Sequence, residues 1–160
     1  MDKEKLLEQF QQQGFSQKII DAFSRVNRED FLPDLYREDA YKDVALPIGY
    51  GQTISQPSTI AFMLEKLGTE NGQKILEVGS GSGYVLALMN EIVENAEIYG
   101  SERIAELINA SRYNLKKHQN IKIVHTPDAL GIPAYAPFDR ILVSAAAEKS
   151  VPPELIDQLK

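Results

Sequence analysis

A glycine-rich turn is the segment of this sequence whose residues most clearly suit ligand chemistry. It spans residues 77–84 and has the sequence E-V-G-S-G-S-G-Y. Glycines let the backbone approach a ligand closely, and a helix that follows such a turn offers free N–H groups to an anion. A dinucleotide site of the G-x-G-x-x-G/A type needs a small third residue, but that place falls on Tyr84 or Leu86. The turn therefore predicts a different kind of ligand.

The observed pattern, acid-x-G-x-G-x-G, resembles the S-adenosylmethionine turn of class I methyltransferases. In such a site Glu77 places a carboxylate near the cationic ammonium and sulfonium end of the cofactor. The turn at Gly79, Ser80 and Gly81 accommodates the methionine portion and holds no pyrophosphate. S-adenosyl-L-methionine is therefore the predicted cofactor.

Two more acidic residues fit the same cofactor. Glu102 ends a strand-like segment 19 residues beyond Gly83, a spacing that suits a carboxylate bound to both ribose hydroxyls. Asp128 follows the next such segment, where an acid can meet the adenine amino group. Alone, Glu102 could be an exposed residue at a helix start, where the helix dipole favours an acid. Because the glycine turn lies upstream, we interpret both acids as cofactor-binding residues.

A long uncharged segment precedes these motifs. Residues 42–57 contain two prolines and two glycines, which exclude a long regular element, and carry no charge after Asp43. Stretches of this length inside a compact domain are usually functional loops or disordered linkers. A linker would be more polar, so the apolar residues favour a packed functional loop; they are Leu46, Ile48, Tyr50 and Ile54.

The elements that position these segments alternate between helix and strand. Apolar patterns predict strands at 74–78, around 98–100, at 121–124 and at 140–144, and helices at 58–67, 84–93, 103–117 and from 152. Three earlier helical segments are predicted: a helix at 2–13, a second helix that begins after an N-cap at Ser16, and a short helical turn at 27–35. Ser58 is predicted to cap the helix at 58–67. This alternation predicts an α/β fold with a doubly wound, Rossmann-like parallel sheet. We expect one compact domain with N-terminal helices and a loop (1–57) followed by a cofactor-binding core (58–160).

Composition narrows the function classes. The chain has 160 residues, 43% of them hydrophobic, and a net charge of −6 at pH 7. These values suit one folded domain and argue against disorder and against nucleic-acid binding through bulk charge. Zero cysteines exclude disulfides and cysteine nucleophiles, and His118 and His125 have no companions at metal-ligand spacing. With no bilayer-length apolar run and no signal-peptide core, we expect a cytoplasmic protein without a metal.

Several segments together resemble the protein-L-isoaspartate (D-aspartate) O-methyltransferase family. They are N-R-E-D-F-L-P at 27–33, A-Y-K-D at 40–43, L-P-I-G-Y-G-Q-T-I-S-Q-P at 46–57, the glycine turn, F-D-R-I at 138–141, A-A-A at 145–147 and L-I-D-Q-L-K at 155–160. The run G-Q-T-I-S-Q-P is the most specific of these because other methyltransferases lack it. The resemblance extends from about residue 26 to residue 160.

The resemblance implies a repair reaction on damaged proteins. The family methylates the free α-carboxylate of an L-isoaspartyl residue, or the free carboxylate of a D-aspartyl residue, and the ester closes to a succinimide that water opens partly to aspartate. Ser55 is then the catalytic-site serine, and Thr53, Ile54 and Ser55 lie against the cofactor. The implied partners are isoaspartyl peptides and proteins, with neither nucleic acid nor membrane.

The chemistry of the acceptor is consistent with a serine that is not a nucleophile. A carboxylate with a pKa of roughly 3.5 is already ionised at pH 7, so its methylation needs no general base. In-line displacement requires mainly that oxygen, methyl and sulfur be positioned, and a hydroxyl can hold one carboxylate oxygen while the other attacks. From the residues alone, Ser55 could instead bond the loop backbone before Pro57.

Two departures from the family pattern leave alternatives open. Pro127-Asp128-Ala129 stands where the family usually has Gly-Asp-Gly, and the resemblance stops before the Gly-Gly and further strands of the family. A catalytically weak or dead S-adenosylmethionine-binding domain and a small-molecule O-methyltransferase are therefore alternatives. A C-terminally shortened chain also predicts an open sheet edge at 140–144, hence self-association or marginal stability, unless the helix from Pro152 covers it.

Overall fold

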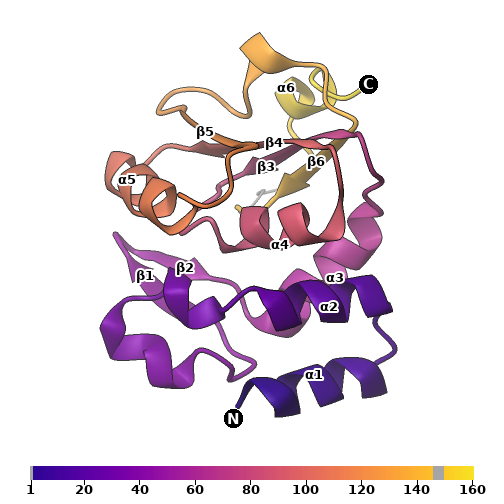
Figure 1. The fold of residues 1–160 in the computed structure, drawn as a ribbon. Helices are drawn as coiled ribbons and strands as arrows, with labels where there is room; N and C mark the ends of the chain where they lie inside the picture. The colour runs from indigo at the N-terminus through magenta and orange to yellow at the C-terminus, as the bar shows by residue number, and fades with distance from the viewer. Residues whose placement is uncertain (1, 146–149) are drawn as a thin grey trace.

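A four-stranded parallel sheet forms the centre of the computed structural model, which describes residues 2–145 and 150–160 (Figure 1). The strand order is β5-β4-β3-β6. The strands are β3 (Lys74–Val78), β4 (Glu97–Glu102), β5 (Ile121–His125) and β6 (Arg140–Val143). The chain winds outward from β3 to β5 and then returns to pair β6 with the other side of β3. This order confirms the predicted doubly wound α/β fold.

Helices connect the strands and cover one face of the sheet (Figure 1). α4 (Tyr84–Ile92) joins β3 to β4, α5 (Ala105–Asn114) joins β4 to β5, and α3 (Pro57–Leu67) leads into β3. The short α6 (Pro153–Ile156) and the 3₁₀ turn η3 (Pro133–Tyr135) lie on the opposite side. In the described part of the chain, no helix has the length and apolar character needed to cross a membrane.

Alternate strand side chains enter two separate cores. Ile75 and Ile98 belong to the larger core, which α4 and the N-terminal helices complete. Leu76 and Tyr99 belong to a smaller core on the other face, together with Val78, Ile132, Phe138 and Leu155. Both faces of the central strands are therefore covered, and every residue at 75–78 of β3 and at 98–102 of β4 is buried.

The N-terminal elements pack onto α4 as part of the larger core. They are α1 (Lys3–Gln12), α2 (Gln17–Arg25), η1 (Arg28–Phe31) and η2 (Asp34–Asp39). The ring of Phe23 lies 5.0 Å from that of Phe10 and 6.1 Å from that of Tyr84, the first residue of α4. Edge-to-face contacts of this kind add about 0.5–1.5 kcal/mol each. The N-terminal helices thus support the segment that follows the glycine-rich turn.

The segment predicted as a packed loop contains a short antiparallel hairpin that the sequence analysis did not foresee. Its strands are β1 (Leu46–Gly49) and β2 (Gln52–Ile54). Tyr50 at the tip has a φ of 54° and is flanked by two glycines that also have positive φ. Positive φ in the turn matches the twist of paired strands. Leu46, Ile48 and Ile54 are buried, as expected of a packed segment, but Tyr50 is 61% exposed because it lies at the tip of the hairpin.

One of the two predicted helix caps is wrong. Ser16 is the N-cap residue of α2, as predicted, but its side chain makes no capping bond, and its backbone N and its Oγ donate to the Glu65 carboxylate, at 3.0 and 2.8 Å. The Ser58 cap is wrong because α3 begins at Pro57, and proline suits the first helical turn. The backbone N of Ser58 donates to Asp43 Oδ1 at 2.8 Å. At both sites, the serine bonds to a carboxylate distant in the sequence.

β6 is an outer strand of the sheet, and the C-terminal residues contact the segment just before it. The backbone N of Phe138 donates to the Gln158 carbonyl (2.8 Å), and that of Lys160 donates to the Phe138 carbonyl (2.9 Å). This extended pairing replaces the longer helix predicted from Pro152. Within residues 2–145 and 150–160, no strand pairs with the outer side of residues 141–143. Ala146 and Ala147, predicted to flank this edge, lie outside the described residues.

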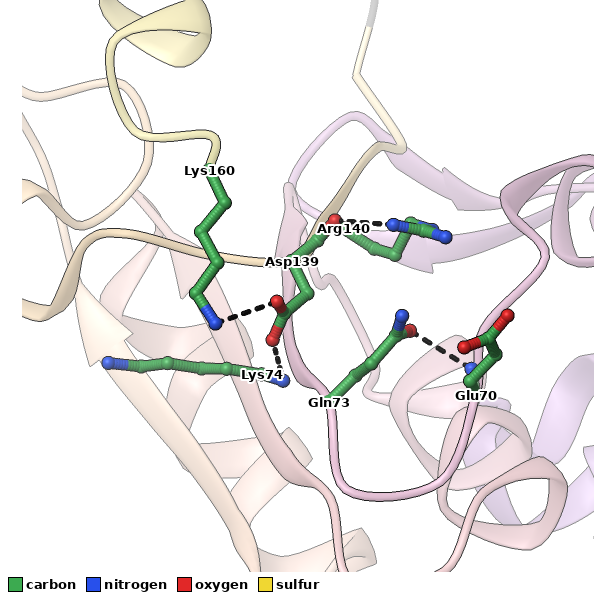
Figure 2. A network of polar contacts seen from close by, with 6 residues as sticks. All are labelled: Glu70, Gln73, Lys74, Asp139, Arg140 and Lys160. Carbon is green, nitrogen blue, oxygen red and sulfur yellow. Dashed lines mark hydrogen bonds and ion pairs between the residues drawn. The ribbon is translucent and has the colours of Figure 1, made fainter.

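A polar network joins the C-terminal segment to the amino ends of β3 and β6 (Figure 2). Asp139 accepts a hydrogen bond from the backbone N of Lys74 (2.8 Å) and forms an ion pair with Lys160 (2.8 Å). The Lys160 ammonium and the Lys74 N–H lower the pKa of Asp139. Arg140 Nε donates to the Leu67 carbonyl (3.1 Å), which adds the end of α3 to the network. The carboxyl ends of these strands, at the other end of the sheet, are left open for a ligand.

Candidate active site

A cavity of about 670 Å³ opens at the carboxyl ends of the parallel strands. It lies where the chain reverses its winding, because β4 flanks β3 on one side and β6 flanks it on the other. Doubly wound sheets bind their ligands at this switch point. Five segments line the cavity: the glycine-rich turn, the end of β4, residues 126–130 after β5, residues 144–145 after β6, and the β1–β2 hairpin with the residue that follows it.

The glycine-rich turn is fixed by the strand beside it. The backbone N–H groups of Gly79 and Ser80 donate to the Ser101 carbonyl of β4, at 2.9 and 3.1 Å. Gly81, at φ 51°, is in a backbone conformation that L side chains rarely adopt, and an added Cβ would lie 3.1 Å from Ile48 Cδ1 of the hairpin, close enough that this side chain would have to shift. A Cβ on Gly83 would lie 2.7 Å from Leu115 Cδ1. The glycines thus permit close packing of the turn against both the hairpin and the end of α5.

Glu102 links the glycine turn to the start of α5. Its Oε2 accepts from the backbone N of Gly81 (2.9 Å), and its Oε1 accepts from those of Arg103 (2.8 Å) and Ile104 (3.0 Å). The side chain is only 7% exposed, yet it lines the cavity. A carboxylate has about four acceptor positions, so one remains beyond these three bonds. Glu102 therefore has a structural role that the sequence did not predict, in addition to its place in the site.

Glu77 lies behind the main cavity, in an adjoining space of about 30 Å³. It is 1% exposed, and its Oε1 accepts from Ser144 Oγ at 2.6 Å, while its Oε2 has no hydrogen-bond partner among the described residues. The pKa of Glu77 is raised to about 8: burial is the main cause, the Ser144 hydrogen bond opposes the rise, and the nearby charge of Glu102 adds to it. A nearby cation would favour the ionised form of this carboxyl group.

The hairpin presents Thr53 and Ser55 to both spaces, and the buried Ile54 to the smaller one. No hydrogen bond joins the Ser55 hydroxyl to the loop backbone in the described part of the chain, so the alternative role as a backbone cap finds no support. Asp43 closes the loop through its bond to Ser58. Fully buried Arg28 donates to the Val44 carbonyl (3.3 Å) and lies 5.4 Å from the centre of the Tyr84 ring.

Asp128 lies on the opposite side of the cavity, in the segment after β5. The backbone N of Thr126 donates to the Glu102 carbonyl (2.9 Å), which extends the pairing of β5 with β4 into this segment. The neighbours of Asp128, Pro127 and Ala129, line the cavity as well. Pro127 and Ala129 stand where the family usually has glycine, and Asp128 between them still lies at the cavity wall.

The structure thus brings all the predicted site residues together. The main cavity is lined by Thr53, Ser55, Gly79, Gly81, Glu102 and Asp128. The adjoining space is lined by Ile54, Glu77 and Ser80, and by several of the same residues. Ser144, which lines both spaces directly after β6, was not among the predicted site residues. Its position at the carboxyl end of a strand was the signal that could have identified it.

The two histidines have structural contacts instead of a ligand site. His118 Nδ1 lies 3.1 Å from Asn90 Nδ2, and His125 Nε2 lies 3.0 Å from the Arg103 carbonyl oxygen. Within residues 2–145 and 150–160, no group of three or more His, Asp or Glu side chains could hold a metal ion.

Comparison with protein families identifies the lineage of this site. The family model of protein-L-isoaspartate(D-aspartate) O-methyltransferase matches residues 1–160. The chain belongs to this family. A protein-L-isoaspartate O-methyltransferase of Fervidobacterium nodosum is 46% identical over 158 residues, which cover 97% of this chain and 79% of the relative. Another, from Methanococcoides burtonii, is 44% identical over 149 residues, which cover 91% of this chain and 73% of the relative.

Solved structures of the family share the fold. One protein-L-isoaspartate O-methyltransferase has a TM-score of 0.89 and 30% identity, and the match covers 99% of this chain and 52% of that one. This chain thus spans about half the length of that protein. A crystal structure from Plasmodium falciparum, described as a protein-L-isoaspartate O-methyltransferase in complex with S-adenosyl-L-homocysteine, has a TM-score of 0.81 and 26% identity. That match covers 100% of this chain and 80% of the other.

Proposed function

We propose that this protein transfers the methyl group of S-adenosylmethionine to the free α-carboxylate of L-isoaspartyl residues, or to the free side-chain carboxylate of D-aspartyl residues, in damaged proteins. One observation carries the proposal. The hairpin residues Thr53 and Ser55 lie in the same cavity as the glycine turn and Glu102. The hairpin holds the sequence most specific to the family, so the cofactor segment and the family-specific segment face one space. Membership of the protein-L-isoaspartate O-methyltransferase family supports the choice of acceptor.

The residues present fit S-adenosylmethionine. A volume of about 670 Å³ falls within the range typical of small-molecule sites. Glu77 has an orphaned, buried carboxyl oxygen, which would face the cationic end of the ligand. Glu102 would accept one hydrogen bond from a ribose hydroxyl at its remaining acceptor position, and Asp128 would meet the adenine amino group. When bound, S-adenosylmethionine supplies a methyl group on a positively charged sulfur, and that sulfur is a good leaving group.

Ser55 is proposed to orient the acceptor. Its hydroxyl would donate a hydrogen bond to one oxygen of the isoaspartyl carboxylate and leave the other oxygen free to attack the methyl carbon in line with sulfur. The carboxylate is already ionised at neutral pH, so no residue has to remove a proton. Positioning of the reacting atoms is therefore the main contribution of the hairpin. The amide nitrogen that follows the isoaspartyl residue then attacks the ester carbonyl and methanol leaves, which closes a succinimide, and water opens this ring partly to aspartate.

A methyl-transfer assay with two matched peptides tests the proposal. One peptide carries a single isoaspartyl residue, its twin carries aspartate at the same place, and both receive S-adenosylmethionine with a labelled methyl group. We expect base-labile label on the isoaspartyl peptide alone. Equal labelling of both peptides would contradict the proposed acceptor, and cofactor binding without any transfer would favour a binding domain.

The partners proposed for this site are proteins and peptides that contain isoaspartate. The sequence-based prediction of a cytoplasmic protein, and that of self-association through β6, stay predictions.

A further inference from the structure

Gln158 is a buried polar residue outside the lining of the cavity. It follows α6 and is only 3% exposed. Its Oε1 accepts from the backbone N of Ile132 (2.7 Å), and its Nε2 donates to the carbonyls of Leu130 (2.9 Å) and Glu154 (2.7 Å). Both amide hydrogens and one acceptor position are thus used. Burial of a side chain as polar as glutamine is tolerated only when it is bonded in this way.

The backbone of Gln158 is fixed to the sheet. Its carbonyl accepts from the backbone N of Phe138, two residues before β6, at 2.8 Å. The Lys160 ion pair with Asp139 holds the same segment from the other side (Figure 2). The Gln158 side chain therefore extends from a firmly held backbone towards the segment after β5.

The fit between Gln158 and that segment is close. Gly131 lies between Leu130 and Ile132, the two residues to which the Gln158 side-chain amide is hydrogen-bonded, and the φ of Gly131 is 71°. A Cβ on Gly131 would lie 2.9 Å from Cδ of Gln158, a distance that real Cβ atoms essentially never show. Glycine at 131 and glutamine at 158 are therefore matched in shape as well as in hydrogen bonding.

This segment needs support from outside itself. Residues 126–130 line the cavity and contain no helix or strand. At one end, Thr126 is bonded to Glu102. At the other end, the Gln158 amide holds the Leu130 carbonyl and the Ile132 N–H. Without the amide, these two backbone groups would lose their partner, although Ile132 is only 3% exposed.

We propose that Gln158 is a positioning residue of the cofactor site, which holds residues 126–132 in the conformation that binds the adenosine part of S-adenosylmethionine. The inference rests on the proposed function only for the identity of the cofactor. Gln158 contacts no reacting atom, so it acts on cofactor affinity and not on the methyl-transfer step. A segment that is competent only about a tenth of the time lowers the apparent affinity about tenfold.

The test is Gln158→Met, which keeps the approximate volume and removes all three hydrogen bonds. We expect the dissociation constant of S-adenosylmethionine, measured by calorimetry, to rise about tenfold. The KM for S-adenosylmethionine should rise in parallel, while kcat and the KM for the isoaspartyl peptide stay within about twofold. In the unliganded protein, the amide of Ile132 should exchange its hydrogen faster while the amides of β3 stay protected.

Two further variants separate positioning from general loss of stability. Leu6 is a buried residue of α1, and Leu6→Ala leaves a cavity in the larger core. This variant should lower the melting temperature without changing cofactor affinity. Gly131→Ala adds a Cβ that would displace the Gln158 side-chain amide, so it should reproduce the affinity loss of Gln158→Met. An unchanged affinity in both Gln158→Met and Gly131→Ala would overturn the inference, and so would an equal loss in Leu6→Ala.

The same experiment distinguishes this inference from the proposed function. If the unaltered chain binds S-adenosylmethionine but labels no isoaspartyl peptide, the proposed acceptor fails, and the affinity of Gln158→Met still decides the role of Gln158. If the unaltered chain does not bind S-adenosylmethionine, both proposals are overturned.

Discussion

The protonation state of Glu77 predicts that cofactor binding releases a proton. With a pKa of about 8, this buried carboxyl group is protonated in about nine of ten molecules at pH 7. The cationic end of S-adenosylmethionine favours the carboxylate, because an opposite charge nearby lowers a carboxyl pKa. At pH 7, removing the proton costs about 1.4 kcal/mol, which is tenfold in affinity. Affinity should therefore rise nearly tenfold between pH 6 and pH 7, and less steeply as the pH approaches 8.

Calorimetry in buffers with different ionisation enthalpies measures the released proton directly. We expect close to one proton per bound cofactor at pH 6.5. Glu77→Gln mimics the protonated form, keeps an acceptor for Ser144 and should bind S-adenosylmethionine more weakly, with no proton release from this site. Affinity that is the same at pH 6 and pH 7 in the unaltered chain would refute the reasoning.

Stability should change in the opposite direction. The folded-state pKa of Glu77 lies above its ordinary value of 4.5, so between these two values the folded protein binds more protons than the unfolded one. The free energy of unfolding therefore falls as the pH rises from about 4.5 to about 8. Glu77→Gln removes this pH-dependent loss of stability. It should therefore raise the melting temperature at pH 8 while it lowers the affinity for the cofactor. Such a trade between stability and binding is typical of functional sites.

Three other predictions concern the rest of the site and the sheet edge. Glu102→Gln should weaken the binding of S-adenosylmethionine by about ten- to a hundredfold in calorimetry, which is the contribution of a charge-assisted hydrogen bond. It should also lower the melting temperature, because the Glu102 side chain holds Gly81 and the start of α5. Unchanged affinity would exclude Glu102 from the ligand contacts. Asp43→Ala should cost about 1–2 kcal/mol in thermal unfolding and slow methyl transfer, because it releases the hairpin loop from Ser58, whereas Asp43→Asn keeps an acceptor and serves as the matched control. Light scattering over a concentration series should show self-association through the outer side of β6, and a monomer at every concentration would contradict the open edge.

Local patterns predicted much of the fold and of the site. The strand at 74–78 was predicted with its observed limits, and Glu102 was placed at the end of the second strand, where the structure has it. These features depend on short runs of apolar residues and on the turn that follows them. The glycine turn was predictable for the same reason, since its function requires a particular residue type at each of a few adjacent places.

Features that depend on distant contacts were missed. Ser144 meets Glu77 only because β6 pairs beside β3, and neither residue signals this by itself. The bonds of the two serines were missed because their partners, Glu65 for Ser16 and Asp43 for Ser58, come from distant segments. The structural role of Glu102 was invisible for a similar reason, since its donors are backbone N–H groups, which every sequence has. The contact of Gln158 with Ile132 likewise exists only in the folded chain.

The most direct measurement follows an isoaspartyl peptide by chromatography during incubation with the protein and S-adenosylmethionine. We predict that the isoaspartyl peptide declines while its aspartyl twin appears, and that Ser55→Ala slows the decline about ten- to a hundredfold with little change in cofactor affinity. An isoaspartyl peptide that persists unchanged, although the protein binds S-adenosylmethionine, would contradict the account.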